Sequence, residues 1–179
     1  MKEKEEQAIV VDYLPYGYPL EKKMMPIAQA IGKKNFTLLE LVPRRGIKLE
    51  IGEEVYIGEG KRDKVYYILG KLPFNKISEN AKNFLQTYIE KQVSENEKSF
   101  VEFFNNSQPV NTRLHQIELL PGFGNKHTQA ILDERNKKPF ESFEELKKRI
   151  SNLPDPKNAI VKRILEEIKG EERHFLFVN

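Results

Sequence analysis

The hydrophobic periodicity of this chain changes once, near Ser78, and that change constrains the fold more than any other feature. Before it, short apolar and β-branched runs are separated by connections rich in Gly and Pro, which is typical of strands. After it, apolar residues recur at the spacing of amphipathic helices. The sequence therefore predicts an α+β protein with a strand-rich start and an all-helical remainder.

Strands are expected in the first part of the chain, which we assign to residues 1–75. They cover residues 8–14, 36–42, 53–58 and 64–72. The last two are expected to pair with each other across the Gly-bearing segment 59–63. Strands of this length with polar connections indicate a small barrel or a curled sheet.

Helices are expected through most of the remainder. We assign connecting helices to residues 76–110 and a helical domain to residues 111–170. The expected helices cover residues 78–93, 94–105, 112–119, 125–136, 142–150 and 155–169. Ser94 with Glu97, and Ser142 with Glu145, have the spacing of capping boxes. Segment 171–179 is too apolar for a frayed end, so a C-terminal strand that returns to the N-terminal sheet is predicted.

The run LLPGFGNKHTQAILDER, residues 119–135, carries the most specific functional signal. Two glycines allow a tight turn and a close approach of phosphate to the backbone amides. The next helix begins directly after them, and its first N–H groups form an anion site together with the helix dipole. Lys126 adds a full positive charge. The predicted phosphate-binding residues are Gly122, Phe123, Gly124, Asn125 and Lys126.

This stretch, with the following PF-x-SF-x-x-L run, resembles the helix-hairpin-helix family of nucleic-acid-binding modules. The alternative is a tight turn between two helices with no ligand. In the second half of such a module another Gly-x-Gly would be expected, but here the sequence is Leu-Pro-Asp-Pro, with Asp155 in place of glycine. We therefore expect a second pseudo-hairpin that mainly supports the first.

Taken whole, the chain resembles an uncharacterised family of predicted RNA-binding proteins found in archaea and some thermophiles. The resemblance implies an OB-like barrel followed by a helix-hairpin-helix region, and a link to RNA or the translation machinery. OB folds bind single strands through basic grooves and stacking aromatics. The candidate contacts in the barrel are Arg44, Arg45, Lys61, Arg62 and Lys64, with Tyr16 and Tyr18. No cofactor is expected, although some relatives hold a monovalent cation against the hairpin carbonyls.

The amino-acid composition excludes several classes of protein and of binding site. The absence of cysteine excludes disulfides and thiolate metal sites. We expect a cytoplasmic protein without a signal peptide or membrane span. A net charge of +3 is too small to argue for nucleic acid by itself. The high charged fraction suits a heat-adapted protein.

No catalytic constellation is visible, since the histidines His115, His127 and His174 are isolated and the aspartates are widely spread. The preferred reading is a non-catalytic nucleic-acid-binding protein, with RNA favoured over DNA. Two alternatives stay open. One is a nuclease or repair-type enzyme that uses the hairpin to hold DNA, and the other is a protein-interaction scaffold.

Overall fold

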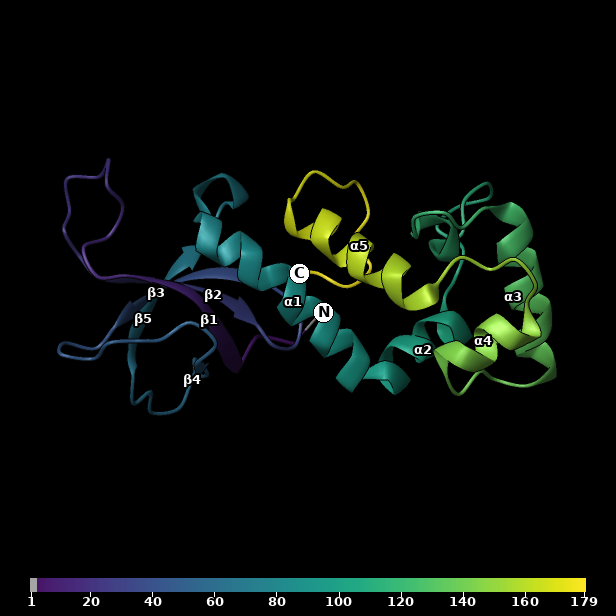
Figure 1. The fold of residues 1–179 in the computed structure, drawn as a ribbon, viewed down its shortest axis with the longest axis horizontal. Coiled ribbons are helices and arrows are strands. Elements are labelled where there is room, and N and C mark those ends of the chain that lie inside the picture. The colour runs from purple at the N-terminus through teal and green to yellow at the C-terminus, as the bar shows by residue number, and fades with distance from the viewer. Residues whose placement is uncertain (1–2) are drawn as a thin grey trace. The chain divides into compact units, whose positions relative to one another are not determined.

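The computed structural model describes residues 3–179 and divides into two compact units. The sheet unit consists of the chain up to Gln86 together with Glu167–Asn179, and the helical unit is Thr87–Glu166. Helices α1 (Glu79–Glu95) and α5 (Pro156–Ile168) each contribute residues to both units. Figure 1 shows the order of the elements along the chain.

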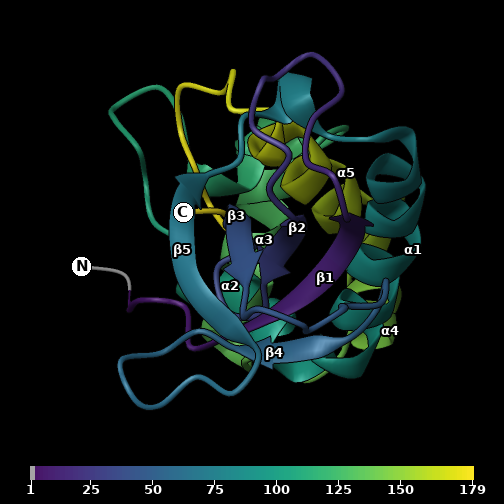
Figure 2. The same ribbon diagram turned by 90° about the vertical axis from the view of Figure 1, so that its left-hand side faces the viewer.

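The sheet unit is built on a five-stranded antiparallel sheet with the order β4-β1-β2-β3-β5. Its strands are β1 (Gln7–Leu14), β2 (Ile27–Gly32), β3 (Leu38–Pro43), β4 (Glu54–Tyr56) and β5 (Val65–Lys71). The sheet is curled, with β4 and β5 as the two edges of its described part (Figure 2). The α+β prediction is thus confirmed at this level.

Two details of the predicted sheet are wrong. The expected hairpin between β4 and β5 does not form, because β4 pairs with β1 and β5 pairs with β3. Strand β2 was not predicted, because every one of its residues is buried and its sequence IAQAIG shows no polar alternation. Paired on both sides, β2 occupies the centre of the sheet.

One face of the sheet forms an apolar core. Residues from all five strands, from the connection between β3 and β4 and from the position directly after β4 contribute to it: Ala8, Val10, Ala28, Ala30, Leu39, Leu41, Leu49, Val55, Ile57 and Val65. On β2 the core members Ala28 and Ala30 alternate with Gln29, as the strand period requires. On β1 a bulge between Val10 and Asp12 breaks this period.

Asp12 and Gln29 connect the sheet to the start of α1. The Ser78 hydroxyl donates to Asp12 at 2.5 Å, and the Ser78 amide donates to the Gln29 side chain at 3.1 Å. The Gln29 amide group also donates to the carbonyl of Lys76, which ends the short 3₁₀ helix η1 (Phe74–Lys76). Both polar side chains are buried but satisfied, as burial demands.

The helical unit contains α2 (Glu97–Asn106), the 3₁₀ helix η2 (Gln116–Leu119), α3 (Asn125–Lys137) and α4 (Phe143–Arg149). The expected helix over 112–119 is wrong in its first half. His115 is the N-cap of η2, because its ring accepts from the Ile117 amide and Glu118 accepts from the His115 amide. The predicted Ser94 cap is also wrong, since Ser94 lies inside α1 and Asn96 precedes α2.

The remaining helix boundaries follow the predicted capping chemistry. Ser142 accepts from the Glu145 amide at the start of α4, and Asp155 accepts from the Asn158 amide at the start of α5. Gly170 follows α5 with φ +80°, a conformation that favours glycine. In the part of the chain that the structure describes, no helix has the length and apolar character needed to cross a membrane.

The C-terminal tail is not the predicted strand. The amides of Leu176, Phe177 and Val178 all donate to one carboxylate oxygen of Glu167, at 2.8–3.1 Å. Amides held by a single oxygen cannot enter a strand ladder, which explains the difference. The tail still packs within the sheet unit, because Val178 is buried and the Asn179 amide donates to the carbonyl of Asn35.

Candidate nucleic-acid interface

The turn Pro121–Gly124 joins η2 to α3 and is where the predicted phosphate site lies. Leu120 and Phe123 are buried on either side of the turn, and the Phe123 amide donates to the Leu120 carbonyl at 3.1 Å. Gly122 has φ +84°, which side chains with a Cβ rarely adopt. The apolar residues thus anchor the turn from beneath, and glycine is required at its tip.

Gly124 has a different role from Gly122. Its backbone is extended, with φ −110° and ψ −169°, so any residue could adopt its conformation. A Cβ built at Gly124 meets no atom within 4 Å. The expectation that both glycines supply backbone freedom therefore holds only for Gly122. At Gly124, an added side chain would enter open space.

The first amides of α3 have no internal partners, as is usual at a helix N-terminus. Thr128 makes the first helical bond, with its amide and hydroxyl both donating to the Gly124 carbonyl at 3.0 Å. The amides of Asn125 and Lys126 donate to no acceptor within residues 3–179. Both residues are exposed, and within the same range Lys126 forms no ion pair. Amides of this kind carry the positive end of the helix dipole.

His127 connects the turn to the loop before α5. Its Nδ1 atom accepts from the Gly124 amide at 3.3 Å, and its Nε2 atom lies 3.2 Å from the carbonyl of Asn152. An accepting Nδ1 requires the proton on Nε2, which then donates to Asn152. The ring also lies 5.9 Å from that of Phe123. His127 is therefore half-buried, and its side chain turns back into the hairpin.

The second turn, 153–156, supports the first. Pro154 lies beneath Gly122, where an added Cβ would come within 3.5 Å of its ring. Asp155 caps α5 and pairs with Lys147 at 3.8 Å. Since a carboxylate already occupies the helix N-terminus where phosphate would bind, this arrangement agrees with the expected pseudo-hairpin.

The resemblance suggests a monovalent cation at the hairpin carbonyls, and two of these carbonyls already accept hydrogen bonds. The Gly124 carbonyl already accepts two hydrogen bonds from Thr128, which uses both of its lone pairs. The Leu120 carbonyl accepts from Phe123.

The basic candidates of the sheet unit divide into separate groups. Arg44 and Arg45 line one hollow, whereas Arg62 lines another and donates to the Gly58 carbonyl. The Arg44 Nε donates to the Arg62 carbonyl at 2.6 Å. Lys64 pairs with Glu53, which lowers the pKa of that carboxyl. Lys61 is exposed in the connection between β4 and β5.

The two candidate tyrosines point in different directions. Tyr18 turns inward, donates to Glu40 at 2.8 Å and lies under the Lys76 ammonium. Burial raises the pKa of Tyr18, and the neighbouring Glu40 adds to this effect. Tyr16 is 71% exposed in the same connection. Tyr18 therefore anchors the connection to the sheet, and only Tyr16 is free to meet a ligand.

The comparisons with known proteins agree on one family. Residues 4–179 match the family described as "Protein of unknown function (DUF655)". The chain belongs to the DUF655 family. The uncharacterized protein MJ0038 of Methanocaldococcus jannaschii is 40% identical over 176 residues, which cover 97% of this chain and 80% of that protein.

A solved structure supports the same assignment. The crystal structure of the DUF655 protein Af1531 from Archaeoglobus fulgidus has a TM-score of 0.82 and 42% identity to this chain. The match covers 98% of this chain and all of that one. The predicted membership of an uncharacterised archaeal family is confirmed.

The residues of this DUF655 chain that carry chemistry are few. No group of three or more His, Asp or Glu side chains with metal-binding geometry occurs between residues 3 and 179. His115 is buried, and burial lowers its pKa, with Arg135 adding to the effect. The arrangement of the hairpin can hold an anion through amides and one ammonium.

Sequence reasoning missed two parts of the DUF655 site. The inward turn of His127 could have been suspected from its spacing, since a polar side chain three residues after the N-cap can reach back to the N-cap amide. Tyr66 lines the hollow of Arg44, Arg45 and Lys48 but comes from β5, a separate segment of the chain, as do Met25 and Pro26 from the β1–β2 connection. No local pattern brings those segments together.

Proposed function

We propose that this DUF655 protein is a non-catalytic nucleic-acid-binding protein that holds a phosphate group at the hairpin. The observation that carries the proposal is the set of outward amides at Asn125 and Lys126, beside an unpaired ammonium and an open Gly124. Amides at a helix N-terminus bind phosphate oxygens directly, and a lysine adds charge without demanding a base sequence. Binding is therefore independent of sequence and sensitive to salt.

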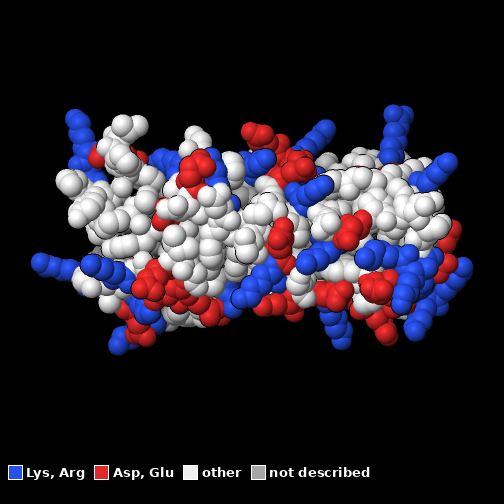
Figure 3. Space-filling model, in the orientation of Figure 1, with Lys and Arg blue, Asp and Glu red and all other residues white. Residues whose placement is uncertain are grey.

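The proposal assigns the helix-hairpin-helix arrangement to η2, the turn and α3, with the 153–156 turn as its degenerate partner. The curled sheet takes the place of the OB-like barrel, open between β4 and β5. RNA is the preferred target, and a role beside the translation machinery stays a prediction. Both rest on the resemblance to predicted RNA-binding proteins. On the face drawn in Figure 3, basic and acidic side chains are mixed. This supports a nucleic-acid contact that is limited to the hairpin.

Labelled RNA and DNA strands, each incubated with the protein at several salt concentrations with and without Mg²⁺, test this function. We expect intact strands to be retained at low salt and released as salt rises, with RNA bound more tightly than DNA. Cleavage that depends on Mg²⁺ would instead identify a nuclease. If neither strand is retained at low salt, the proposal is wrong and a protein-interaction scaffold becomes the better account.

A further inference from the structure

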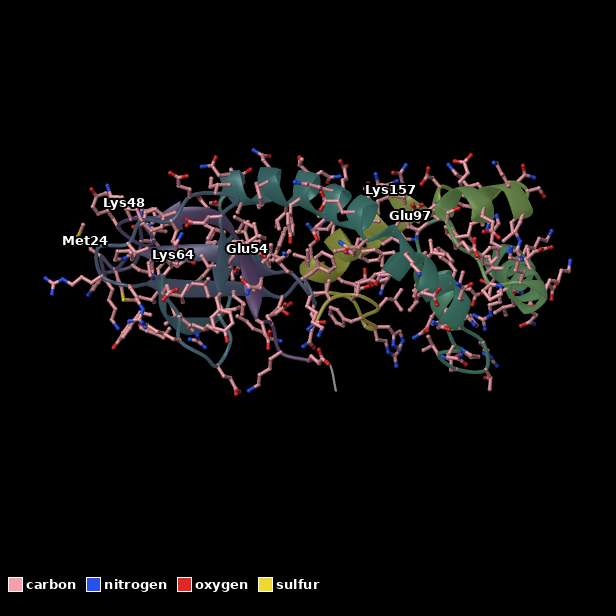
Figure 4. All side chains as sticks on the ribbon, turned by 90° about the horizontal axis from the view of Figure 1, so that it is seen from below. Met24, Lys48, Glu54, Lys64, Glu97 and Lys157 are labelled. Carbon is pink, nitrogen blue, oxygen red and sulfur yellow. The ribbon has the colours of Figure 1, made fainter. Side chains whose placement is uncertain are left out.

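The sheet unit has a hollow of about 480 Å³ at the end where the β1–β2 connection meets the β3–β4 connection. Its volume lies within the range of roughly 300–1,000 Å³ that is usual for small-ligand sites. The lining residues are Tyr13, Met25, Pro26, Val42, Pro43, Arg44, Arg45, Gly46, Ile47, Lys48 and Tyr66. Figure 4 labels Lys48 and Met24 at this end of the sheet unit.

All charged side chains that line this hollow are basic. Its lining contains Arg44, Arg45 and Lys48 and no carboxylate. None of these three side chains forms an ion pair within the described residues, in contrast to Lys64 on the same unit. Three basic side chains that share one hollow, with no carboxylate among its lining residues, favour an anionic ligand.

The apolar part of the hollow offers an aromatic face. Tyr66, on β5, is 64% exposed, and its ring stands edge-to-face with Tyr67 at 5.3 Å between centroids. The Tyr67 hydroxyl contacts the sulfur of Met25 at 3.9 Å, which links β5 to the β1–β2 connection. Tyr66 is thus held by a neighbouring ring while its own surface stays open to a ligand.

We propose that this hollow binds an unstacked base of a single-stranded nucleic acid. Tyr66 provides the stacking surface, and Arg45 and Lys48 contact the phosphates on either side. A single strand combines a flat aromatic group with a charge on every linkage, which matches an aromatic surface bordered by unpaired cations. A base inside a duplex is already stacked and cannot enter. The site belongs to the sheet unit and does not depend on contacts at the hairpin.

The test compares Tyr66 variants in binding a labelled oligouridine and an RNA duplex of the same length. We expect Tyr66→Ala to weaken single-strand binding about tenfold, because loss of one stacked base has an effect of this order. Duplex binding should stay within about twofold of the wild type, since it uses phosphate contacts alone. Tyr66→Phe keeps the stacking surface and should bind the single strand like the wild type.

Two further variants separate charge from stacking. The double change Arg45→Ala and Lys48→Ala should lower the salt slope for the single strand by about 1.4, the value for two phosphate contacts. Phe175→Ala removes an exposed aromatic ring that lies outside the hollow and should change nothing. Circular dichroism checks that each variant is folded.

The outcomes distinguish this site from the hairpin. Equal weakening of single strand and duplex by Tyr66→Ala, or no weakening of either, would overturn the single-strand site. Loss of single-strand binding in Tyr66→Ala, with duplex binding that disappears only in Gly124→Val, supports both sites. If Gly124→Val leaves duplex binding intact while Tyr66→Ala still weakens the single strand, the hollow stands and the hairpin proposal fails.

Discussion

The Nδ1 atom of His127 accepts a hydrogen bond from the backbone amide of Gly124 at 3.3 Å. This contact holds the residue before α3 in its extended conformation, and the other ring nitrogen reaches the Asn152 carbonyl. One side chain therefore joins the hairpin to the turn that supports it. The geometry in front of Asn125 and Lys126 depends on this connection.

Replacing His127 tests the connection. In His127→Ala the Gly124 amide loses its acceptor, and the free energy of unfolding should fall by about 1 kcal/mol, as for a typical hydrogen bond. Hydrogen exchange of the Gly124 amide should become faster than in the wild type. Unchanged exchange at Gly124 would show that the imidazole does not hold the turn.

The two glycines of the turn should differ in their effect on stability. Gly122→Val places a β-branched residue at φ +84°, a conformation that is strained for any side chain with a Cβ, so we expect a loss of about 1–3 kcal/mol. Gly124→Val enters open space from an extended backbone and should stay within about 0.5 kcal/mol of the wild type. Chemical denaturation measures both. Equal losses would contradict the different roles assigned to them.

Lys126 should contribute charge without sequence preference. Lys126→Ala should weaken binding to all strands by a similar factor and reduce the salt slope by about one unit. Lys137→Ala, at the other end of α3, is the matched control, because Lys137 already pairs with Glu134. A loss that depends on base sequence would argue against a backbone contact.

Arg149 is expected to stabilise the helical unit rather than to bind ligand. Its guanidinium pairs with Glu134 and Glu145, donates to the Lys138 carbonyl and lies 4.3 Å from the centre of the Phe140 ring. Arg149→Ala removes all of these contacts together, although Glu134 keeps Lys137 as a partner, so the protein should unfold more easily than the wild type. Thermal denaturation measures the loss, and Arg149→Lys should recover only part of it. Normal stability in Arg149→Ala would show that the contacts add nothing.

His115 makes the stability of the protein depend on pH. Burial lowers its pKa in the folded state below the ordinary value of 6.5, so the unfolded chain takes up the proton first. The stabilisation is complete above about pH 6.5 and is lost as the pH falls toward the folded-state pKa. His115→Asn keeps an acceptor for the Ile117 amide but cannot titrate in this range. Its melting temperature should fall less than that of the wild type between about pH 7 and pH 5, and an equal fall would exclude His115 as the cause.

The features that could be predicted from the sequence are those that depend on residues close together in the chain. The caps at Ser142 and Asp155 and the stop at Gly170 are of this kind, because each acts on its own helix end. Strand β2 escaped prediction because burial on both faces removes the alternation that identifies a strand. The partners of β4 and β5 escaped because sheet order is decided by tertiary packing.

The candidate site follows the same division. Gly122, Gly124 and Lys126 could be named from one short motif, and the structure brings them to a single turn. The conformation of the C-terminal tail could not be predicted, because its amides donate to the carboxylate of Glu167, which lies nine or more residues earlier in the chain. The hollow around Tyr66 combines three distant segments, so only the folded chain shows it.

Fluorescence anisotropy of a labelled RNA duplex, titrated at low salt with wild-type protein and with Gly124→Val, tests the central claim most directly. A valine side chain in front of the Asn125 and Lys126 amides should block phosphate while the fold stays intact. We predict at least about a tenfold loss of affinity, equivalent to the 1.4 kcal/mol of a single good contact. Wild-type affinity in a folded Gly124→Val protein would contradict the account.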